Sequence, residues 1–261
     1  MIQITPIKAF SDNYIWQLCQ PGHTHCVVID PGQSEPVLSS LLPGQVISEI
    51  LITHHHYDHT DGVKAILEKF PSCKVYGPKM DKGFSIDVIL KDGEQVFIDS
   101  LNLSFQIKAI PGHTLDHISY YAINANQPVL FCGDTLFSAG CGRMFEGTEA
   151  LFWSSLKMLK QYPENTQVYC THEYTQANLK FANFIEPNNV AIAEHIKAVD
   201  VLRKSDTPSL PSNLKTELAI NPFLKSDLAS MKKRIAEIVN TESDITDSQC
   251  FGFLRKLKDN F

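Results

Sequence analysis

The stretch at 53–62, THHHYDHTDG, holds four histidines and two aspartates directly after the apolar residues 50–52. Imidazole and carboxylate groups are the ligands that zinc and related divalent metals take in proteins. A loop that only meets water needs no such bias in its side chains. The stretch therefore points to metal binding, through a pattern His-x-His-x-Asp-His that consists of His54, His56, Asp58 and His59.

The spacing of this pattern offers two pairs of ligands. Side chains alternate along an extended chain, so His54 and His56 point the same way if the backbone stays extended to about His56. Asp58 and His59 then follow where the chain turns into a helix over about 60–70. The first pair suits one metal ion, and the second pair suits another ion close by.

Three further candidates each follow an apolar run elsewhere in the chain: His113, Asp134 and His172. Functional side chains in α/β proteins are commonly placed where strands end. One zinc ion needs about four ligands, of which water is often one. The seven candidates together therefore suit a dinuclear site.

Taken singly, these residues have simpler explanations. A lone histidine after a strand is usually an ordinary hydrogen-bonded polar residue, and Asp58 could be the N-cap of the helix that follows it. The joint pattern of seven residues favours the metal site over those explanations. We keep the simpler explanation for the five other histidines: His23, His25, His55, His117 and His195.

Apolar patterns predict the elements that position these side chains. Continuous or alternating apolar runs predict strands at 25–30, 49–53, 101–110, 128–132 and 167–170. A 3.6-residue period predicts one helix over 63–70 and another that Thr148 caps, with Leu151, Phe152, Leu156 and Leu159 on its apolar face.

The period of the pattern changes near residue 174, which predicts two domains. We expect an α/β metal-binding catalytic domain over 1–174 and a helical domain over 175–261. Helical patterns in the second part lie at 179–185, 192–202 and 228–238. The Pro- and Ser-containing stretch at 205–213 predicts a loop, and we expect no strand after 174.

Composition limits the class of protein. A formal net charge of -6 argues against a general nucleic-acid binder, whose affinity depends on a positive surface. The N-terminal residues do not resemble a secretory leader, and no apolar run approaches the ~20 residues that cross a bilayer. The seven scattered cysteines contain no Cys-x-x-Cys pair, so we expect no disulfide framework. We expect a cytoplasmic monomer with neither nucleic-acid nor membrane partners.

The motifs together resemble the metallo-β-lactamase superfamily, through THHHYDHTDG, PGHT, GDT and THEY in that order. The segments 132-CGDTLFSAGCGRMFEGT-148, 170-CTHEYTQANLKFA-182, 221-NPFL-224 and 251-FGFLRKLKDNF-261 resemble its glyoxalase II (hydroxyacylglutathione hydrolase) family. The resemblance spans nearly the whole chain, from 11-SDNY-14 to the last residue. It implies an αββα sandwich of two mixed sheets flanked by helices, followed by a helical glutathione-binding domain.

The resemblance also implies how the metals are held. It gives one ion to His54, His56 and His113, a second ion to Asp58, His59 and His172, and places Asp134 between the two. Zn²⁺ is expected, although the same ligands accept iron or manganese. Two such ions ~3.5–4 Å apart can share a hydroxide. That hydroxide is the implied nucleophile, with Asp58 and Asp134 as the catalytic carboxylates.

The implied reaction is hydrolysis of S-(2-hydroxyacyl)glutathione thioesters, chiefly S-D-lactoylglutathione, to glutathione and D-lactate in methylglyoxal detoxification. The family positions for binding glutathione correspond to Arg143, Phe145, Tyr174, Arg255 and Lys258. Without the resemblance, Arg255 and Lys258 would be assigned to a solvated helix face. Some relatives have Lys-x-Tyr where this chain has Arg-Met-Phe at 143–145. The missing phenol removes one hydrogen bond, worth about 0.5–1.5 kcal/mol.

Other functions share parts of this pattern. A β-lactamase would not need the helical second part, and a nuclease would need a basic face. A persulfide dioxygenase uses a similar motif with one iron, and the motif alone does not count metals. A metal-binding protein without activity is disfavoured because all seven ligands are present. A thioesterase with Cys141 as nucleophile is disfavoured because the Gly-Cys-Gly context predicts a turn.

Overall fold

A computed structural model describes residues 2–123, 125–242 and 244–261 of the protein. Within it the chain forms two compact units. The first unit contains the chain up to Ala109 together with Asp116–Gly133 and Tyr169–His172, and the second unit contains Ile110–Leu115, Asp134–Val168 and Glu173–Phe261. The two units therefore interleave along the sequence.

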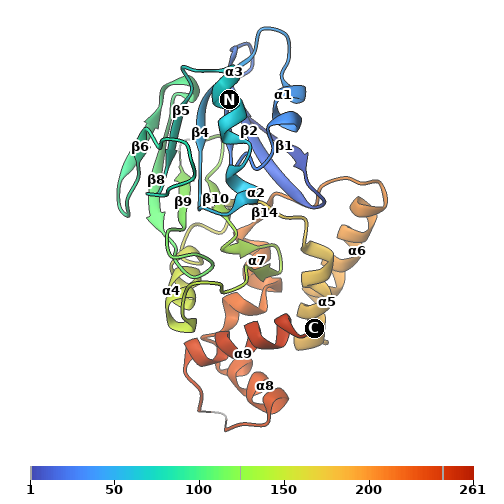
Figure 1. Ribbon diagram of the computed structural model, residues 1–261. Coiled ribbons are helices and arrows are strands. Elements are labelled where there is room, and N and C mark those ends of the chain that lie inside the picture. Colours follow the sequence, from blue (N-terminus) through green and yellow to red (C-terminus); the bar gives the residue numbers. More distant parts are fainter. Residues whose placement is uncertain (1, 124, 243) are drawn as a thin grey trace. The chain divides into compact units, whose positions relative to one another are not determined.

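The first unit contains a six-stranded mixed sheet with the strand order β1-β2-β3-β4-β5-β6 (Figure 1). Neighbours are antiparallel from β1 to β3 and parallel from β3 to β6. The strands are β1 (Gln3–Ala9), β2 (Asn13–Cys19), β3 (His25–Ile29), β4 (Val46–Leu51), β5 (Lys74–Gly77) and β6 (Val88–Ile89).

Parallel pairing in this sheet brings strand ends together. Parallel neighbours need a crossover connection, and α1 (Ser34–Ser40) and α3 (Val63–Lys69) lie in two of these connections beside the sheet (Figure 1). Their apolar residues Val37, Val63 and Ile66 are fully buried in one core with residues of β3, β4 and β5. The carboxyl ends of β3 and β4 therefore lie at one edge. The short helix α2 (Tyr57–Thr60) follows there.

The second sheet has the strand order β14-β13-β10-β9-β8-β7. Neighbours from β7 to β10, and the pair β13 and β14, are antiparallel. The strands are β7 (Gln95–Ile98), β8 (Leu103–Ala109), β9 (Ile118–Ala122), β10 (Val129–Gly133), β13 (Gln167–Cys170) and β14 (Ser212–Asn213). The 3₁₀ helix η1 (Asp99–Leu101) ends at Asn102, which has a left-handed φ of 49°, so β8 begins later than the run at 101–110 predicts.

Large aromatic side chains join the two sheets inside the first unit. The Trp16 ring meets the Tyr169 ring edge-on at 4.9 Å between centroids, and its Nε1 donates to the Cys170 carbonyl at 2.9 Å. The Tyr120 hydroxyl donates to the Ile52 carbonyl at 2.8 Å. The polar atoms of these two rings thus both have a partner on the opposite sheet or at its edge. These bonds fix where the chain leaves β4 and β13.

The second unit is mainly helical. Its elements include β11 (Leu136–Phe137), β12 (Gly140–Cys141), α4 (Glu149–Leu159), α5 (Thr175–Ile185), α6 (Val190–Lys204), α7 (Leu214–Ile220), η2 (Pro222–Lys225), α8 (Ala229–Val239) and α9 (Asp247–Asp259). The Thr148 side chain accepts from Leu151 N, so the predicted cap of α4 is confirmed. Among the described residues, no helix combines the length and apolarity that a bilayer crossing requires.

Three details differ from the sequence predictions. β4 ends at Leu51, so the strand does not continue to His56. β14 is a strand after residue 174, where none was expected, because a two-residue edge strand carries no readable period. Cys19 and Cys26 form a disulfide, since the register of β2 and β3 sets them opposite each other. The other five cysteines are buried and take part in no disulfide.

Candidate metal centre

The first pair of ligand candidates lies in the irregular segment between β4 and α2. His54 is fully buried, and its Nε2 lies 3.1 Å from Nδ1 of His56. Two nitrogens bound to one tetrahedral zinc, each at 2.0–2.1 Å, would be roughly 3.3 Å apart. The prediction that these imidazoles project together is confirmed, although a bend at residues 53–54 brings them together and not a continued strand.

Asp30, at the end of β3, fixes this segment. Its carboxylate accepts hydrogen bonds from the backbone N and the hydroxyl of Thr53 at 2.8 and 2.7 Å. The same carboxylate lies 3.1 Å from Nδ1 of His59. Asp30 is not among the site residues predicted from the sequence, although its place at the end of the run 25–30, beside the parallel strand β4, was a usable signal. The stacking of the His117 ring on His54, at 4.5 Å between centroids, was not predicted either.

The second pair lies on α2 and meets His172 after β13. Oδ2 of Asp58 is 3.6 Å from Nε2 of His59 and 3.5 Å from Nε2 of His172. Two residues where the chain passes from β1 to β2 contact His172 and Asp58. Nδ1 of His172 is 2.8 Å from the Asp12 carboxylate, and the Asn13 amide donates to Asp58 at 3.0 Å. Asp12 and Asn13 are not among the site residues predicted from the sequence, because no local pattern links them to partners 160 and 45 residues away.

In the second unit, His113 and Asp134 lie together. Nε2 of His113 is 3.5 Å from Oδ2 of Asp134, and its Nδ1 is 2.8 Å from the Arg143 carbonyl. Both side chains are buried. Gly142 makes this closeness possible, since a Cβ there would lie 1.9 Å from the Asp134 carbonyl oxygen and 3.0 Å from Nδ1 of His113. Position 142 therefore has no room for a side chain.

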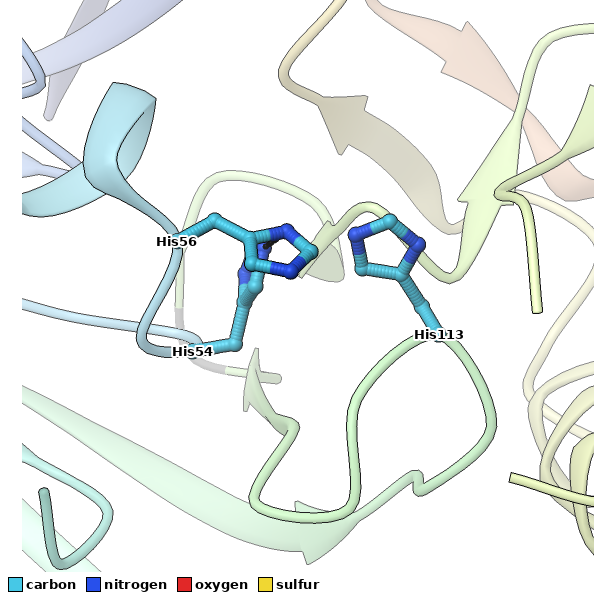
Figure 2. Close-up of side chains that lie close together, drawn as sticks. All are labelled: His54, His56 and His113. Carbon is cyan, nitrogen blue, oxygen red and sulfur yellow. Dashed lines mark hydrogen bonds between the residues drawn. The ribbon is translucent and has the colours of Figure 1, made fainter. Parts of the chain in front are cut away.

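The candidate donors form clusters of the kind that binds divalent ions. The ligand atoms of His54, His56 and His113 lie within 4.8 Å of one another, and Figure 2 shows their rings directed toward a common space. The same limit holds for the group Asp58, His59 and His172. These clusters support a dinuclear divalent metal site.

The hydrogen bonds of the histidines fit metal binding. Metal-ligating histidines usually engage their other ring nitrogen with a carboxylate or carbonyl oxygen, which fixes the tautomer. His113 and His172 do so with hydrogen bonds through Nδ1, to the Arg143 carbonyl and Asp12, and Nδ1 of His59 lies 3.1 Å from the Asp30 carboxylate. In each case Nε2 faces a carboxylate of the predicted ligand set.

Three of the predicted glutathione-binding residues are accessible in the second unit. The Arg143 side chain is 68% exposed, with Nε 3.8 Å from the Asp259 carboxylate. Phe145 is exposed and meets the His113 ring edge-on at 5.3 Å. Tyr174 is partly exposed and packs against Phe137. These side chains can therefore meet a ligand without rearrangement.

Arg255 and Lys258 lie on α9 in different environments. Arg255 is only 5% exposed, so the solvated-face alternative is wrong for it. Its guanidinium donates to the Cys141 carbonyl at 2.9 Å and pairs with Asp259 at 3.0 Å. The Lys258 ammonium donates to the Ala177 carbonyl at 3.2 Å, and burial, followed by the charge of Arg255, lowers its pKa.

Cys141 is poorly suited to nucleophilic catalysis. The thiol is buried, and burial raises its pKa to about 11 despite the opposing effect of the Arg255 charge. Reactive cysteines have thiolates at neutral pH because their pKa is depressed. The turn predicted from the Gly-Cys-Gly context is not at those residues, because Gly140 and Cys141 form β12 and the turn of the β11–β12 hairpin is at Ser138 and Ala139. The structure therefore gives no support to the cysteine alternative.

Comparison with known families assigns both parts of the chain. The family model described as Metallo-beta-lactamase superfamily matches residues 14–172. The one described as Hydroxyacylglutathione hydrolase C-terminus matches residues 173–261. Proteins named hydroxyacylglutathione hydrolase from Pseudoalteromonas translucida and Pseudomonas aeruginosa are each 47% identical to the chain, over the full length of both sequences.

Solved structures show the same fold at lower sequence identity. The B3 metallo-β-lactamase BLEG-1 superimposes with a TM-score of 0.62 at 22% identity, covering 86% of this chain and 99% of its own. ETHE1 from Myxococcus xanthus also has a TM-score of 0.62, at 21% identity, covering 97% of this chain and 95% of its own. At such identities the likeness establishes the fold alone, and it confirms the predicted fold class.

Replacing a ligand of the first pair tests the metal assignment. We expect His54→Ala to lose bound metal, because one of the three clustered imidazoles is removed. Metal content by plasma mass spectrometry and binding by calorimetry measure the effect. His23→Ala, which alters an exposed histidine, should keep full metal content. A His54→Ala protein with unchanged metal content and affinity would contradict the assignment.

Replacing Asp12 tests the support of the second cluster. We expect Asp12→Ala to weaken metal binding there by about 10- to 100-fold, because the partner that fixes the His172 tautomer is lost. Asp12→Asn should bind more tightly than Asp12→Ala, since its amide oxygen can still accept from Nδ1. Stepwise metal titration separates the two binding events. Two unchanged events in Asp12→Ala would refute this role.

Proposed function

The chain belongs to the hydroxyacylglutathione hydrolase family of the metallo-β-lactamase superfamily, a family of thioester hydrolases, and we propose that its principal substrate is S-D-lactoylglutathione. The products are glutathione and D-lactate. The observation that carries the proposal is that one chain combines His and Asp metal clusters with a region, residues 173–261, that matches the hydroxyacylglutathione hydrolase C-terminus. Other 2-hydroxyacyl groups of similar size belong to the same substrate class.

We propose the following ligands: His54, His56 and His113 for one ion, Asp58, His59 and His172 for the other, and Asp134 for both. The ions proposed are Zn²⁺, because imidazole and carboxylate at these spacings suit it, and the same donors accept iron or manganese. Bound there, the ions supply Lewis-acid activation of water and of the thioester carbonyl. Oxygen partners on three of the histidines hold Nε2 ready for this task.

The protein's own residues then position the reacting groups. The carboxylates of Asp58 and Asp134 are the proposed catalytic groups, oriented by the Asn13 amide and by the close fit at Gly142. Either carboxylate can accept the proton of a water that attacks the thioester carbon, and the carbon–sulfur bond then breaks. The leaving thiol has a pKa of about 8.5, so it departs as a thiolate with little help from an acid. No cysteine or serine nucleophile is required.

Cationic and aromatic residues of the second unit are the proposed glutathione contacts. Arg143 and Lys258 suit the two carboxylates of the tripeptide, and a guanidinium matches a carboxylate in a bidentate way. Tyr174 and Phe145 flank them with accessible rings. Arg255 would meet the substrate only if its contacts with Cys141 and Asp259 rearranged, because its guanidinium is buried. Arg143 is therefore the more direct test of binding.

The proposed setting is a cytoplasmic monomer. Free glutathione is the main thiol of the reducing cytosol, where a glutathione thioester forms and is consumed. The formal net charge of -6 gives no support to a nucleic-acid partner.

The first experiment follows free thiol released from S-D-lactoylglutathione by the purified protein. We expect release that disappears when chelator strips the metal and returns when Zn²⁺, Mn²⁺ or Fe²⁺ is restored. The metal content of the protein as purified identifies the native ions. Glutathione persulfide, with oxygen uptake as the readout, serves as the negative control for a persulfide dioxygenase. Protein that holds two metals and releases no thiol would disprove the proposed substrate.

Arg143→Ala tests the binding residues. We expect KM to rise by about 10-fold or more with little change in kcat, because a charge-assisted hydrogen bond to a substrate carboxylate is worth about 1.5–3 kcal/mol. Lys256→Ala removes another exposed cation of the second unit, which pairs with Glu149, and should leave both constants unchanged. An unaltered KM in Arg143→Ala would remove that residue from the binding set.

A further inference from the structure

The segment from Asp134 to Arg143 supports His113 from both of its ends. Asp134 faces Nε2 of His113 at one end, and the Arg143 carbonyl engages Nδ1 at the other, 2.8 Å away. Between them lie only the two-residue strands β11 and β12 and their turn. An isolated two-stranded hairpin is marginally stable at best. Contacts from elsewhere in the second unit must therefore hold this segment in place.

Glu217, on α7, reaches into the turn of this hairpin. It is fully buried, and its carboxylate accepts from the Ser138 hydroxyl at 3.0 Å and from Ala139 N at 2.8 Å. The hydroxyl of Ser212 also donates to it. Ala139 has a φ of 55°, an unfavourable conformation for a residue with a Cβ. A conformation of this kind persists where its surroundings hold it, and Glu217 provides that constraint.

Asn221, one helical turn after Glu217, holds the two strands. Its side-chain amide donates to the carbonyls of Phe137 at 3.1 Å and Gly140 at 2.9 Å, and lies 3.2 Å from the Glu217 carboxylate. Its own oxygen accepts from Phe223 N. Asn221 is fully buried, so these bonds face no competition from water. The hairpin is thus bound through both strands and its turn.

The burial of this carboxylate needs a reason beyond stability. Desolvation raises the pKa of Glu217, and the hydrogen bonds that it accepts only partly offset the effect. A well-packed apolar residue is often as stabilising as a buried ionisable group. Buried polar networks that are fully satisfied instead specify one arrangement of the groups they contact. The hydrogen bonds of Glu217 specify the conformation of the segment between Asp134 and Arg143.

We propose that Glu217 and Asn221 are positioning residues for the metal centre, which hold the β11–β12 hairpin so that Asp134 and the Arg143 carbonyl keep their places around His113. The inference rests on the proposed function, because it takes Asp134 and His113 as metal ligands. Neither Glu217 nor Asn221 contacts a ligand atom of that set in the described part of the chain. They act through the backbone of the hairpin.

The test compares metal affinity in Glu217→Ala and Glu217→Gln. We expect the alanine variant to bind metal about 10- to 100-fold more weakly, the range found when the support of a ligand is lost, and to lose kcat more than KM changes. The glutamine variant should recover affinity to within a few fold. Its oxygen can accept from Ala139 N and Asn221, while its amide donates to the hydroxyls of Ser138 and Ser212.

A control separates positioning from general stability. Glu186 makes a 2.6 Å pair with Lys225 in the same unit, and within the described residues none of its hydrogen bonds reaches the hairpin. Glu186→Ala should lower the melting temperature and leave metal affinity unchanged. If Glu217→Ala does not fold, Ser138→Ala, which removes a single donor, replaces it. The inference is overturned if the folded variant melts earlier but binds metal with wild-type affinity. A wild-type protein without thiol release would count against the proposed substrate alone, because metal affinity is read without turnover.

Discussion

The placement of the histidine Nδ1 atoms is the constraint on which the site depends. A buried imidazole needs a partner for each nitrogen, and an oxygen on Nδ1 decides where Nε2 points. Asp30 at the end of β3, Asp12 in the turn after β1 and the Arg143 carbonyl provide those oxygens. They come from three separate parts of the chain. The order of the strands in the sheets is what brings such distant oxygens beside the histidines.

The strand register thus determines which side chains lie beside the metal-ligand candidates. Antiparallel pairing of β1 and β2 places their turn next to His172, where Asn13 forms an isolated bridge. Parallel pairing of β3 and β4 places Asp30 beside Thr53. The hydrogen bonds of Trp16 and Tyr120 to carbonyls at strand ends then prevent these edges from sliding. A shift of register by one residue would turn each of these side chains to the other face.

The sequence predicts what is local and leaves out what depends on folding. The spacing of His54, His56, Asp58 and His59 is visible in a single stretch, and each of the other three ligand candidates follows an apolar run. The helix capped by Thr148 and the exact limits of β13 at 167–170 were also predictable from local pattern. By contrast, Asp12, Asp30 and Glu217 are ordinary acidic residues in the sequence. Only the strand order and the packing of α7 give them a role, and no local period reports either. The disulfide of Cys19 and Cys26 depends in the same way on the pairing of β2 and β3.

The interleaving of the two compact units limits the modularity of this protein. The change in the period of the apolar pattern near residue 174 suggests that recombination could exchange the helical part as a block. The hairpin that follows Asp134, however, belongs to the same unit as α7, and its turn is completed by groups encoded about 80 residues later. A replacement for the helical part would need an acidic residue and an amide at the positions of Glu217 and Asn221. Grafting and gene-fusion designs on this scaffold should therefore inherit residues 134–143 and α7 from the same parent.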